Sequence, residues 1–366
     1  MPAEMKNVIS GSGRSFCIFE GKLMVLKMAK EITGWGIAIV FSIAILNLFT
    51  FCFYHPVHEL SRSGGASPGL MVPYQWGLYG TEGWGIQTID SNGYPNPDLP
   101  LEEEYYCITG MSHTEGFHSM KGERYSDILN QKSGYHDSLK FYNIAHSGYE
   151  FDQIARHFKG IVEEFPDMEG IIIEIDSTNY SVERLNNALD QIGYTEENDS
   201  IEALLAKLSV KDRSVITFKN YFPFFRLLSM QLETYRKSCS EKKMQNVSDP
   251  EISLNINEYK KSLDKVFTCM RSEYQGRILI VYHPSTTLNS DGSLSVSHSE
   301  TDDIFEAECA RYKIDFINLR PDFEKAFYDD NHAVYGFWNT TLMYGHINKY
   351  CHQIIADKIY DYLYHG

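Results

Sequence analysis

The sequence has too little positive charge for a nucleic-acid-binding protein. It contains 33 Lys and Arg against 49 Asp and Glu among 366 residues, which gives a formal net charge of −16. Proteins that bind the phosphate backbone need a basic patch or stripe. This balance therefore argues against DNA or RNA as a partner, and it makes polyanionic substrates less attractive.

The seven cysteines form no pattern typical of a metal or redox site. No C-x-x-C pair and no other metal-ligand spacing occurs among them. Buried free thiols are the simplest interpretation, and one or two disulfides are the alternative. The sequence also has no internal repeat and no low-complexity segment. We predict no metal site and no cofactor.

One long stretch lacks charge altogether. Gly34 to Tyr54 contains no charged residue, and a helix of that length covers roughly 30 Å, the thickness of a bilayer core. Lys and Arg precede this segment, whereas the flank after it has none until Arg62. The positive-inside rule therefore places residues 1–33 in the cytoplasm and the chain after Tyr54 outside. We expect an uncleaved signal anchor; a cleaved signal peptide is the alternative, but the charged leader is long and no small-x-small cleavage site follows closely.

The exported part begins with a segment of mixed composition. Residues 55–80 are rich in Gly, Ser and Pro, which is typical of a linker, and a short β lead-in follows to about residue 100. From residue 101 to 366, runs of strand-forming residues alternate with segments of helical periodicity. The expected strands are 105–109, 140–146, 169–175, 276–283 and 315–319. Such alternation predicts an α/β domain with a parallel sheet covered on both faces.

A mostly helical stretch interrupts this alternation at about residues 181–276. Inserts of this kind form lids over active sites or enlarge the core. The sequence does not separate these two possibilities.

Several residues that could carry chemistry follow predicted strands. In doubly wound sheets, ligands bind at the carboxyl ends of the strands. Ser112 follows the first strand between two turn-forming glycines, Gly148 follows the second strand, and Asn179 follows the third. His346 precedes the last helix, where an imidazole could accept the proton of a serine hydroxyl. Backbone N–H groups and an Asn side chain could stabilise the oxyanion that forms when the serine attacks.

These segments resemble motif blocks of the SGNH/GDSL hydrolases. "ITGMSHTEG" is similar to the first block, "YNIAHSGYE" to the second, "IIIEIDSTNY" to the third and "YGHINKYCHQIIADKI" to the fifth. The resemblance implies a flavodoxin-like three-layer α/β/α fold, with Ser112 as the nucleophile and His346 as the general base. It also implies an oxyanion hole made by the Ser112 backbone N–H, Gly148 and Asn179. The third block has about one residue more than the usual pattern, so Thr178 or Ser177 could replace Asn179.

The sequence departs from the family pattern beside the serine and before the histidine. Met111 replaces the usual Asp next to the serine, a side chain that is not the nucleophile. Met343 occupies the position where the family often has Asp. Three interpretations remain open: a Ser–His dyad oriented by a backbone carbonyl, an orienting role for Asp329, Asp330 or Asn339, or a loss of catalysis.

The resemblance extends to membrane-anchored SGNH/GDSL family members of the bacterial cell envelope. It implies a serine-dependent esterase that acts on acyl esters, above all O-acetyl esters, of an envelope or exported carbohydrate through an acyl-enzyme at Ser112. An O-acyltransferase that uses a sugar hydroxyl as acceptor is one alternative. A non-catalytic glycan-binding component of the envelope is another. The expected partners are an acylated carbohydrate and the membrane, reached through a single N-terminal helix.

Overall fold

The computed structural model describes residues 12–61, 66–67, 69–189, 200–244 and 255–365. The chain divides into two compact units, Met1–Cys52 and Phe53–Gly366. Helix α1 (Ser12–Phe51) forms the first unit. By length and composition, its segment Met24–Phe51 can cross a membrane, and its most apolar window is not buried against protein. The expected span Gly34–Tyr54 lies within this helix except for its last three residues.

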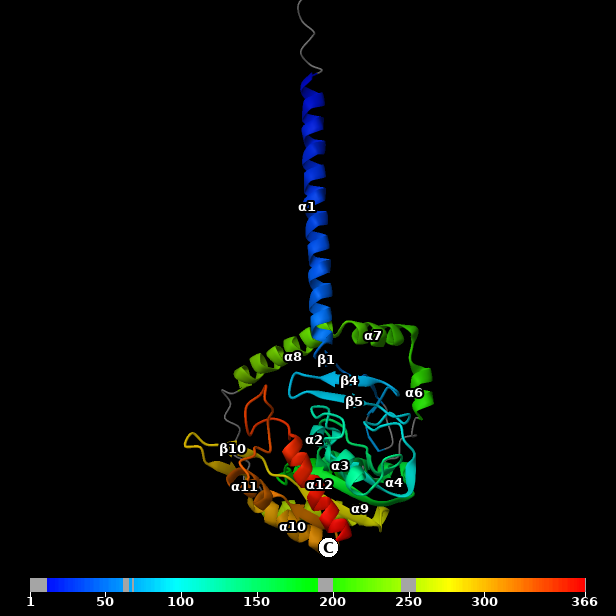
Figure 1. Ribbon diagram of the computed structural model, residues 1–366, viewed down its shortest axis with the longest axis vertical. Helices are drawn as coiled ribbons and strands as arrows, with labels where there is room; N and C mark the ends of the chain where they lie inside the picture. Colours follow the sequence, from blue (N-terminus) through cyan, green and yellow to red (C-terminus); the bar gives the residue numbers. More distant parts are fainter. Residues whose placement is uncertain (1–11, 62–65, 68, 190–199, 245–254, 366) are drawn as a thin grey trace, which may run out of the picture. The chain divides into compact units, whose positions relative to one another are not determined.

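The second unit is built around a five-stranded parallel sheet (Figure 1). In spatial order its strands are β7 (Leu139–Asn143), β6 (Leu101–Thr109), β8 (Met168–Ile175), β9 (Arg277–Tyr282) and β12 (Asp315–Asn318). Numbered along the chain, that order is 2-1-3-4-5, the flavodoxin-like order. The predicted parallel α/β sheet is therefore confirmed.

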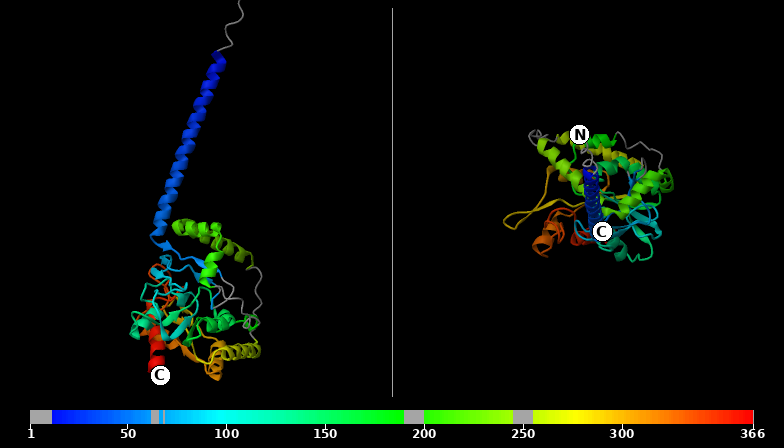
Figure 2. Two further views of the ribbon diagram at one scale, coloured as in Figure 1. Left: turned by 90° about the vertical axis from the view of Figure 1, so that its right-hand side faces the viewer. Right: turned by 90° about the horizontal axis from the view of Figure 1, so that it is seen from above.

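Alternate residues of the central strands pack into two separate hydrophobic cores, one on each face of the sheet. Ile171, Ile173 and Ile175 belong to one hydrophobic cluster, and Ile172 on the same strand belongs to the other. Such near-continuous apolar strands are expected when both faces of a sheet are covered. The helices that contribute to the first cluster are α4 (Phe151–Glu164), α5 (Val182–Leu189), α6 (Ile201–Lys207), α9 (Ile256–Glu273) and α10 (Glu300–Arg311). Those that contribute to the second are α3 (Tyr125–Lys132), α11 (Arg320–Tyr328) and α12 (Lys349–Tyr364), which completes three layers (Figures 1 and 2).

Residues 53–100 belong to this unit and do not form a linker outside it. Strands β1 (Tyr54–His55), β4 (Trp76–Tyr79) and β5 (Gly85–Thr88) make an antiparallel sheet, and β2 (Glu59–Ser61) pairs with β3 (Gly69–Met71). Side chains from this segment, including Leu60, Leu70 and Tyr94, are buried in the first cluster. The Gly, Ser and Pro residues of this segment that the structure describes lie within or next to these short strands.

The helical insert has two kinds of members. Helices α5 and α9 bury Leu185, Tyr259 and Phe267 in the main core, so the ends of the insert enlarge it. Helices α7 (Val210–Tyr221) and α8 (Pro223–Met244) lie on the surface, and α7 has no buried residue. Residues 190–199 and 245–254 of the predicted insert lie outside the described residues.

The remaining small elements are the helix α2 (Ser112–Glu115) and a hairpin of β10 (Thr286–Leu288) and β11 (Leu294–Val296). Five cysteines are free thiols in the described part of the chain. Three of them, Cys107, Cys309 and Cys351, are buried, as the composition suggested.

The docking of residues 53–100 predicts how the chain tolerates truncation. A fragment of residues 53–366 retains the whole second unit and should unfold in one cooperative thermal transition. A fragment of residues 101–366 loses nine buried apolar side chains among the described residues. A buried Leu, Ile, Val or Met is worth about 1.5–3 kcal/mol, so this fragment should lack that transition or melt at a much lower temperature. Circular dichroism melting of both fragments measures this. Equal melting temperatures would show that residues 53–100 are dispensable for the fold.

Candidate active site

Ser112 lies at the turn that follows the central strand β6. The strand ends at Thr109, and helix α2 begins at Ser112. Between them, Gly110 has no room for a side chain, because a Cβ there would fall against the Glu174 carboxylate and the Thr114 hydroxyl. The Ser112 hydroxyl is half-buried and lies 2.9 Å from Nε2 of His346. The predicted strand–Gly–Ser turn thus places the serine beside the predicted histidine.

A buried carboxylate holds this turn in place. Glu174, near the end of β8, accepts a hydrogen bond from the backbone N–H of Met111 (3.0 Å) and another from the hydroxyl of Thr114 (2.7 Å). Its other oxygen bonds Nε2 of the fully buried His283. Burial alone would raise the pKa of Glu174, but the charge and hydrogen bond of His283 outweigh it and lower that pKa to about 2. The same interaction outweighs the effect of burial on His283, whose pKa is raised, so both shifts favour the ionic form of the pair.

His346 is held from the side opposite the serine by Glu82. The Glu82 carboxylate accepts from the backbone N–H of His346 (2.8 Å) and bonds its Nδ1 (2.6 Å). Burial would raise the pKa of Glu82, but these bonds and the His346 charge lower it to about 2. Gly345 has a φ of +90°, and a Cβ there would collide with this carboxylate. Serine, imidazole and carboxylate therefore stand in the relative positions of a catalytic triad.

The carboxylate comes from the predicted β lead-in ahead of the sheet, where the sequence indicated no catalytic residue. Glu82 lies in the turn between β4 and β5, 264 positions before His346. The family resemblance directs attention to the residues just before the histidine, so it offers no signal for this contact. The local signal is the pair of glycines, Gly80 and Gly83, that brackets Glu82 in the sequence "GTEGWG".

The three predicted orienting residues do not perform that task, because Glu82 occupies the Nδ1 side of the imidazole. Asp329 and Asp330 are exposed at the end of α11. Asn339 instead holds the turn that carries Glu82: its side chain accepts from the Gly83 N–H (2.8 Å) and donates to the Gly80 carbonyl (3.2 Å). The dyad interpretation, with a backbone carbonyl on Nδ1, is likewise replaced by this carboxylate.

The predicted oxyanion donors lie in the two loops that follow the neighbours of β6. The His146 N–H donates to the Gly110 carbonyl (3.2 Å), which ties the loop after β7 to the nucleophile turn. In that loop, Gly148 is exposed with a φ of +76° and open space beside its Cα. Asn179, after β8, is exposed. The oxyanion role of Gly148 and Asn179 stays a prediction.

Thr178, the alternative to Asn179, is already engaged in the interior. Its hydroxyl bonds the Asp302 carboxylate and the Thr301 hydroxyl, and the side chain is buried. A hydroxyl fixed in this way is not free to turn toward a substrate. Ser177 accepts from the Asn179 N–H (3.1 Å) and is only half-buried, so it remains the alternative donor.

Two further histidines pack against His346. The ring centroid of His118 lies 4.1 Å from that of His346, and the centroid of His113 lies 5.2 Å away. Burial and the nearby His346 charge lower the pKa of His118 to about 4, and burial and His283 hold the pKa of His113 well below its usual range. Both rings are therefore neutral at pH 7 and do not add positive charge beside the imidazole.

One group of side chains in the described part of the chain could hold a metal ion, namely Glu82, His118 and His346. Ligand atoms of Glu82, His118 and His346 lie within 4.8 Å of one another. Two of these residues also make the hydrogen bonds of the triad. A metal bound there would therefore compete with the contacts that orient the imidazole.

An aromatic pocket of about 580 Å³ adjoins the site through His118. Its walls include Trp84, Phe337, Trp338 and Tyr350. Trp338 is 81% exposed, so one of its ring faces is open to a ligand. Pockets of this size, with apolar walls and a few polar groups, are typical of small-molecule sites.

Known proteins resemble this chain in structure only. Neither family models nor curated proteins give a match. An acetyl xylan esterase shares 12% identity over 70% of this chain and 98% of its own, with a TM-score of 0.35. The esterase EstA from Pseudoalteromonas sp. shares 11% identity over 71% of this chain and 96% of its own, with a TM-score of 0.34. An extracellular lipase from Streptomyces rimosus shares 15% identity over 60% of this chain and 81% of its own, with a TM-score of 0.27. At these values the likeness does not bear on activity, which has to be inferred from the side chains.

The bonds of Glu82 predict the effect of removing its charge. In Glu82→Gln the side-chain amide can donate to Nδ1 and favour the wrong tautomer, so we expect kcat for ester hydrolysis to fall about 10²- to 10⁴-fold. Glu82→Asp keeps the charge and should lose less activity. Steady-state kinetics with melting temperatures as a folding control measure this. An unchanged kcat in folded Glu82→Gln would mean that another group orients His346.

The Glu174–His283 pair predicts a loss of stability. Glu174→Gln leaves a buried donor without its acceptor and should lower the free energy of unfolding by roughly 3 kcal/mol. Glu169→Gln is the matched control, because Glu169 is exposed on the same strand; it should cost less than about 1 kcal/mol. Urea unfolding of both variants measures the difference.

The same pair predicts how that difference depends on pH. The folded-state pKa of Glu174 lies below its ordinary value of 4.5, so its contribution is present above pH 4.5 and is lost as pH falls toward 2. The pKa of His283 is raised above 6.5, so its contribution is present below pH 6.5 and is lost as pH rises through the folded pKa. The gap between wild type and Glu174→Gln should therefore be widest between pH 4.5 and 6.5. A gap that does not vary from pH 3 to 9 would contradict the ionic pairing.

Proposed function

We propose that the protein is a serine esterase of the SGNH/GDSL type that cleaves acyl esters through a covalent acyl-enzyme at Ser112. The observation that carries this proposal is the continuous chain of hydrogen bonds from the Ser112 hydroxyl through His346 to Glu82. A hydroxyl 2.9 Å from Nε2 is within the reach that proton transfer to a general base requires.

The mechanism follows from these positions. As Ser112 Oγ bonds the acyl carbonyl carbon, its proton passes to Nε2 of His346, and the carbonyl electrons move onto oxygen. Glu82 stabilises the imidazolium and keeps Nδ1 protonated. When the tetrahedral intermediate collapses, the ester C–O bond breaks and His346 returns the proton to the leaving alcohol. Water then repeats the sequence on the acyl-enzyme, releasing the carboxylic acid and free Ser112.

The negative oxygen of each tetrahedral intermediate needs convergent donors. The backbone N–H groups of Ser112 and Gly148 and the side-chain amide of Asn179 are the proposed set. The bond from His146 N–H to the Gly110 carbonyl supports this assignment, since it holds the Gly148 loop beside the nucleophile turn.

We infer a carbohydrate as the alcohol part of the ester and acetyl as the favoured acyl group. The aromatic pocket beside His118 supports the carbohydrate, because exposed indole faces such as that of Trp338 can stack on the apolar face of a sugar ring. The acetyl preference rests on the motif resemblance.

Two alternatives use the same site. An O-acyltransferase shares the first half-reaction and differs only in using a sugar hydroxyl in place of water; a membrane anchor suits such a role in envelope assembly. The alternative of a non-catalytic glycan-binding component rests on Met343, which occupies the position where the family often has the orienting Asp. Glu82 supplies that acid from elsewhere in the chain, which favours catalysis.

We further propose that α1 anchors the protein in a membrane, with the N-terminal segment in the cytoplasm and the second unit outside. The Lys and Arg residues before the apolar segment and their absence just after it support this orientation. The length of α1 supports the anchoring itself.

The nucleophile is tested with p-nitrophenyl acetate and a fluorophosphonate probe on the full-length protein in detergent. Wild type should turn over the ester and be labelled, and Ser112→Ala should lose both, with a fall in kcat of about 10⁴-fold or more. Ser290→Ala, an exposed serine in the turn between β10 and β11, is the matched control and should be labelled normally. Labelling without turnover, followed by turnover on addition of an oligosaccharide acceptor, would favour the transferase. A folded wild type that is neither labelled nor active would contradict a serine nucleophile.

A further inference from the structure

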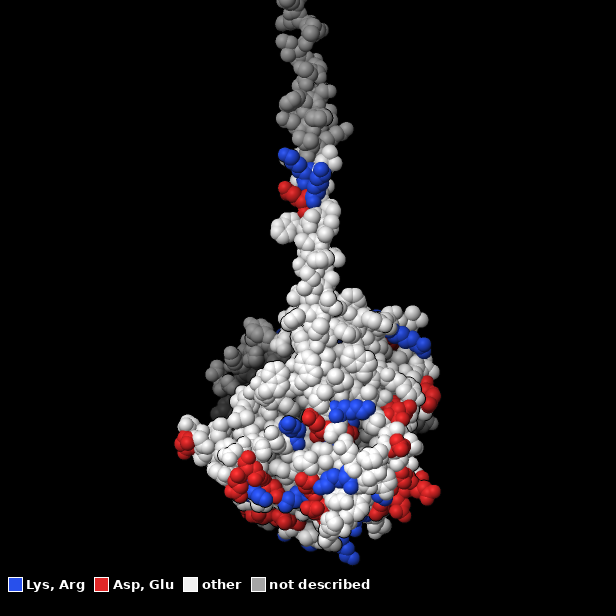
Figure 3. Space-filling model, in the orientation of Figure 1, with Lys and Arg blue, Asp and Glu red and all other residues white. Residues whose placement is uncertain are grey.

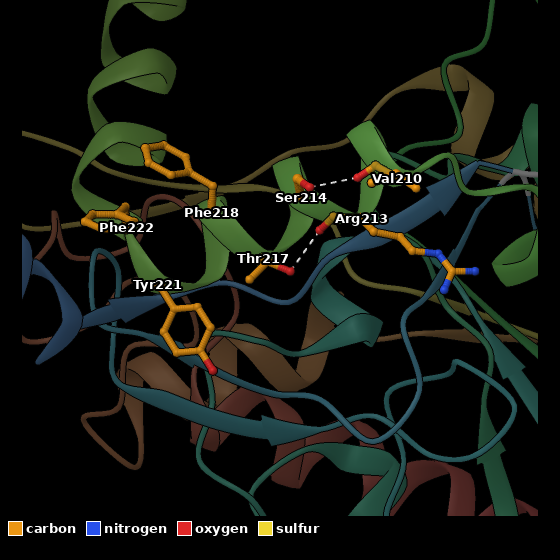
Figure 4. A pocket seen from close by; sticks show the side chains of 7 residues that line it. All are labelled: Val210, Arg213, Ser214, Thr217, Phe218, Tyr221 and Phe222. Carbon is orange, nitrogen blue, oxygen red and sulfur yellow. Dashed lines mark hydrogen bonds between the residues drawn. The ribbon is translucent and has the colours of Figure 1, made fainter.

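Helix α7 lies on the surface with large apolar side chains exposed. None of its residues is buried. Val210 is 83% exposed, Phe218 48% and Tyr221 69%. Together with Phe222 they line an open apolar pocket of about 700 Å³ (Figure 4). A short helix that buries nothing is marginal in water, so this face is expected to be covered by something apolar.

Helix α8 continues the same apolar surface. Phe222 at the corner packs on Phe218 with ring centroids 4.7 Å apart, and Phe225 lies 5.8 Å from Phe218. Beyond this cluster, Leu228 and Leu232 are exposed on α8, at 44% and 50%. We call the exposed side chains of Val210–Leu232 the α7–α8 face.

The charge of this region is opposite to that of the rest of the chain. Residues 201–244 contain nine Lys and Arg but four Asp and Glu, although acidic residues outnumber basic ones 49 to 33 overall. Figure 3 shows Asp and Glu gathered over the part of the second unit where α10 and α11 lie. A basic, apolar surface on an acidic protein is complementary to a surface that is both apolar and anionic.

Contacts within the second unit tie α8 to the residues that follow α1. The Tyr54 hydroxyl bonds Sδ of Met230 (2.8 Å), and Arg226 donates to the Val57 carbonyl (3.0 Å). Tyr54 follows the end of α1 at Phe51 by three positions, which a chain can span with at most about 11 Å. Chain connectivity alone therefore keeps α8 close to the point where the proposed membrane span ends.

We propose that the α7–α8 face lies on an anionic phospholipid bilayer, the one that α1 spans. Phe218, Phe222, Phe225 and their apolar neighbours enter the boundary between headgroups and acyl chains. The exposed Lys211 and Lys219 of α7 bind lipid phosphates. Surfaces that combine exposed apolar side chains with Lys and Arg bind anionic membranes through both kinds of contact. This inference rests on the proposed anchoring but not on the proposed esterase activity.

The test uses the full-length protein, one copy per nanodisc, in discs of phosphatidylcholine with or without phosphatidylglycerol. Hydrogen–deuterium exchange of peptides covering residues 209–232 is the readout. Exchange should be about tenfold slower in the anionic discs than in the neutral ones, as expected for a contact that shifts local opening. Lys211→Gln/Lys219→Gln, which removes charge from α7 without removing apolar surface, should reduce that difference.

A second variant tests the apolar contact. Val210→Ser/Phe218→Ser/Phe225→Ser should abolish the slow exchange, and an unchanged melting temperature would show that the fold survives. Leu288→Ser, an exposed Leu on β10, is the matched control and should behave as wild type.

Three outcomes would overturn the proposal. Equal exchange in both kinds of disc would show that anionic lipid does not cover the face. Slow exchange only in discs with two copies would assign the face to a second copy of this chain. A chain that does not enter discs at all would remove the anchor and this inference together, while turnover of p-nitrophenyl acetate by the same sample reports separately on the esterase.

Discussion

A single buried carboxylate fixes the geometry on which the site depends. The Glu174 carboxylate accepts hydrogen bonds from the Met111 N–H, the Thr114 hydroxyl and the His283 imidazole. These bonds connect strand β8 to the nucleophile turn and to the end of β9. A charge buried this deeply is stable only when every acceptor position is filled. Any movement of the turn would leave part of this charge without a partner. The position of Ser112 is therefore determined by contacts in the interior.

The sequence allowed the sheet and two of the three residues of the proposed triad to be predicted. The β-branched run at residues 169–175 and the alternation around it required a doubly covered parallel sheet, because both faces of such strands are apolar. Ser112 and His346 follow local patterns, a glycine-flanked turn after a strand and a helix entrance. Glu82 and Glu174 had no such pattern, since what distinguishes them is contact with residues distant in the chain. Periodicity reports which face a residue lies on, but it does not report which residue from another element lies opposite.

The composition of residues 55–80 predicted a linker, whereas the segment packs within the second unit. The reason is related. Gly, Ser and Pro are frequent both in flexible linkers and in tight turns between short strands. What separates the two cases here is the burial of single apolar side chains such as Leu60 and Leu70, which are too far apart to form a recognisable strand pattern. Glu82 follows this segment directly, in the turn between β4 and β5, so the docked residues 53–100 also supply the carboxylate of the proposed triad.

The position of Glu82 also has a consequence for the order in which the chain is made. Glu82 is synthesised 264 residues before His346, and both must be present before the imidazole acquires its partner. A nascent chain that is still being translated through β9, α10 or α11 does not yet contain His346, so it lacks the complete set of serine, histidine and carboxylate. In the proposed mechanism Ser112 therefore becomes reactive only when synthesis of the last helix is about to begin, a form of timing that follows from topology alone.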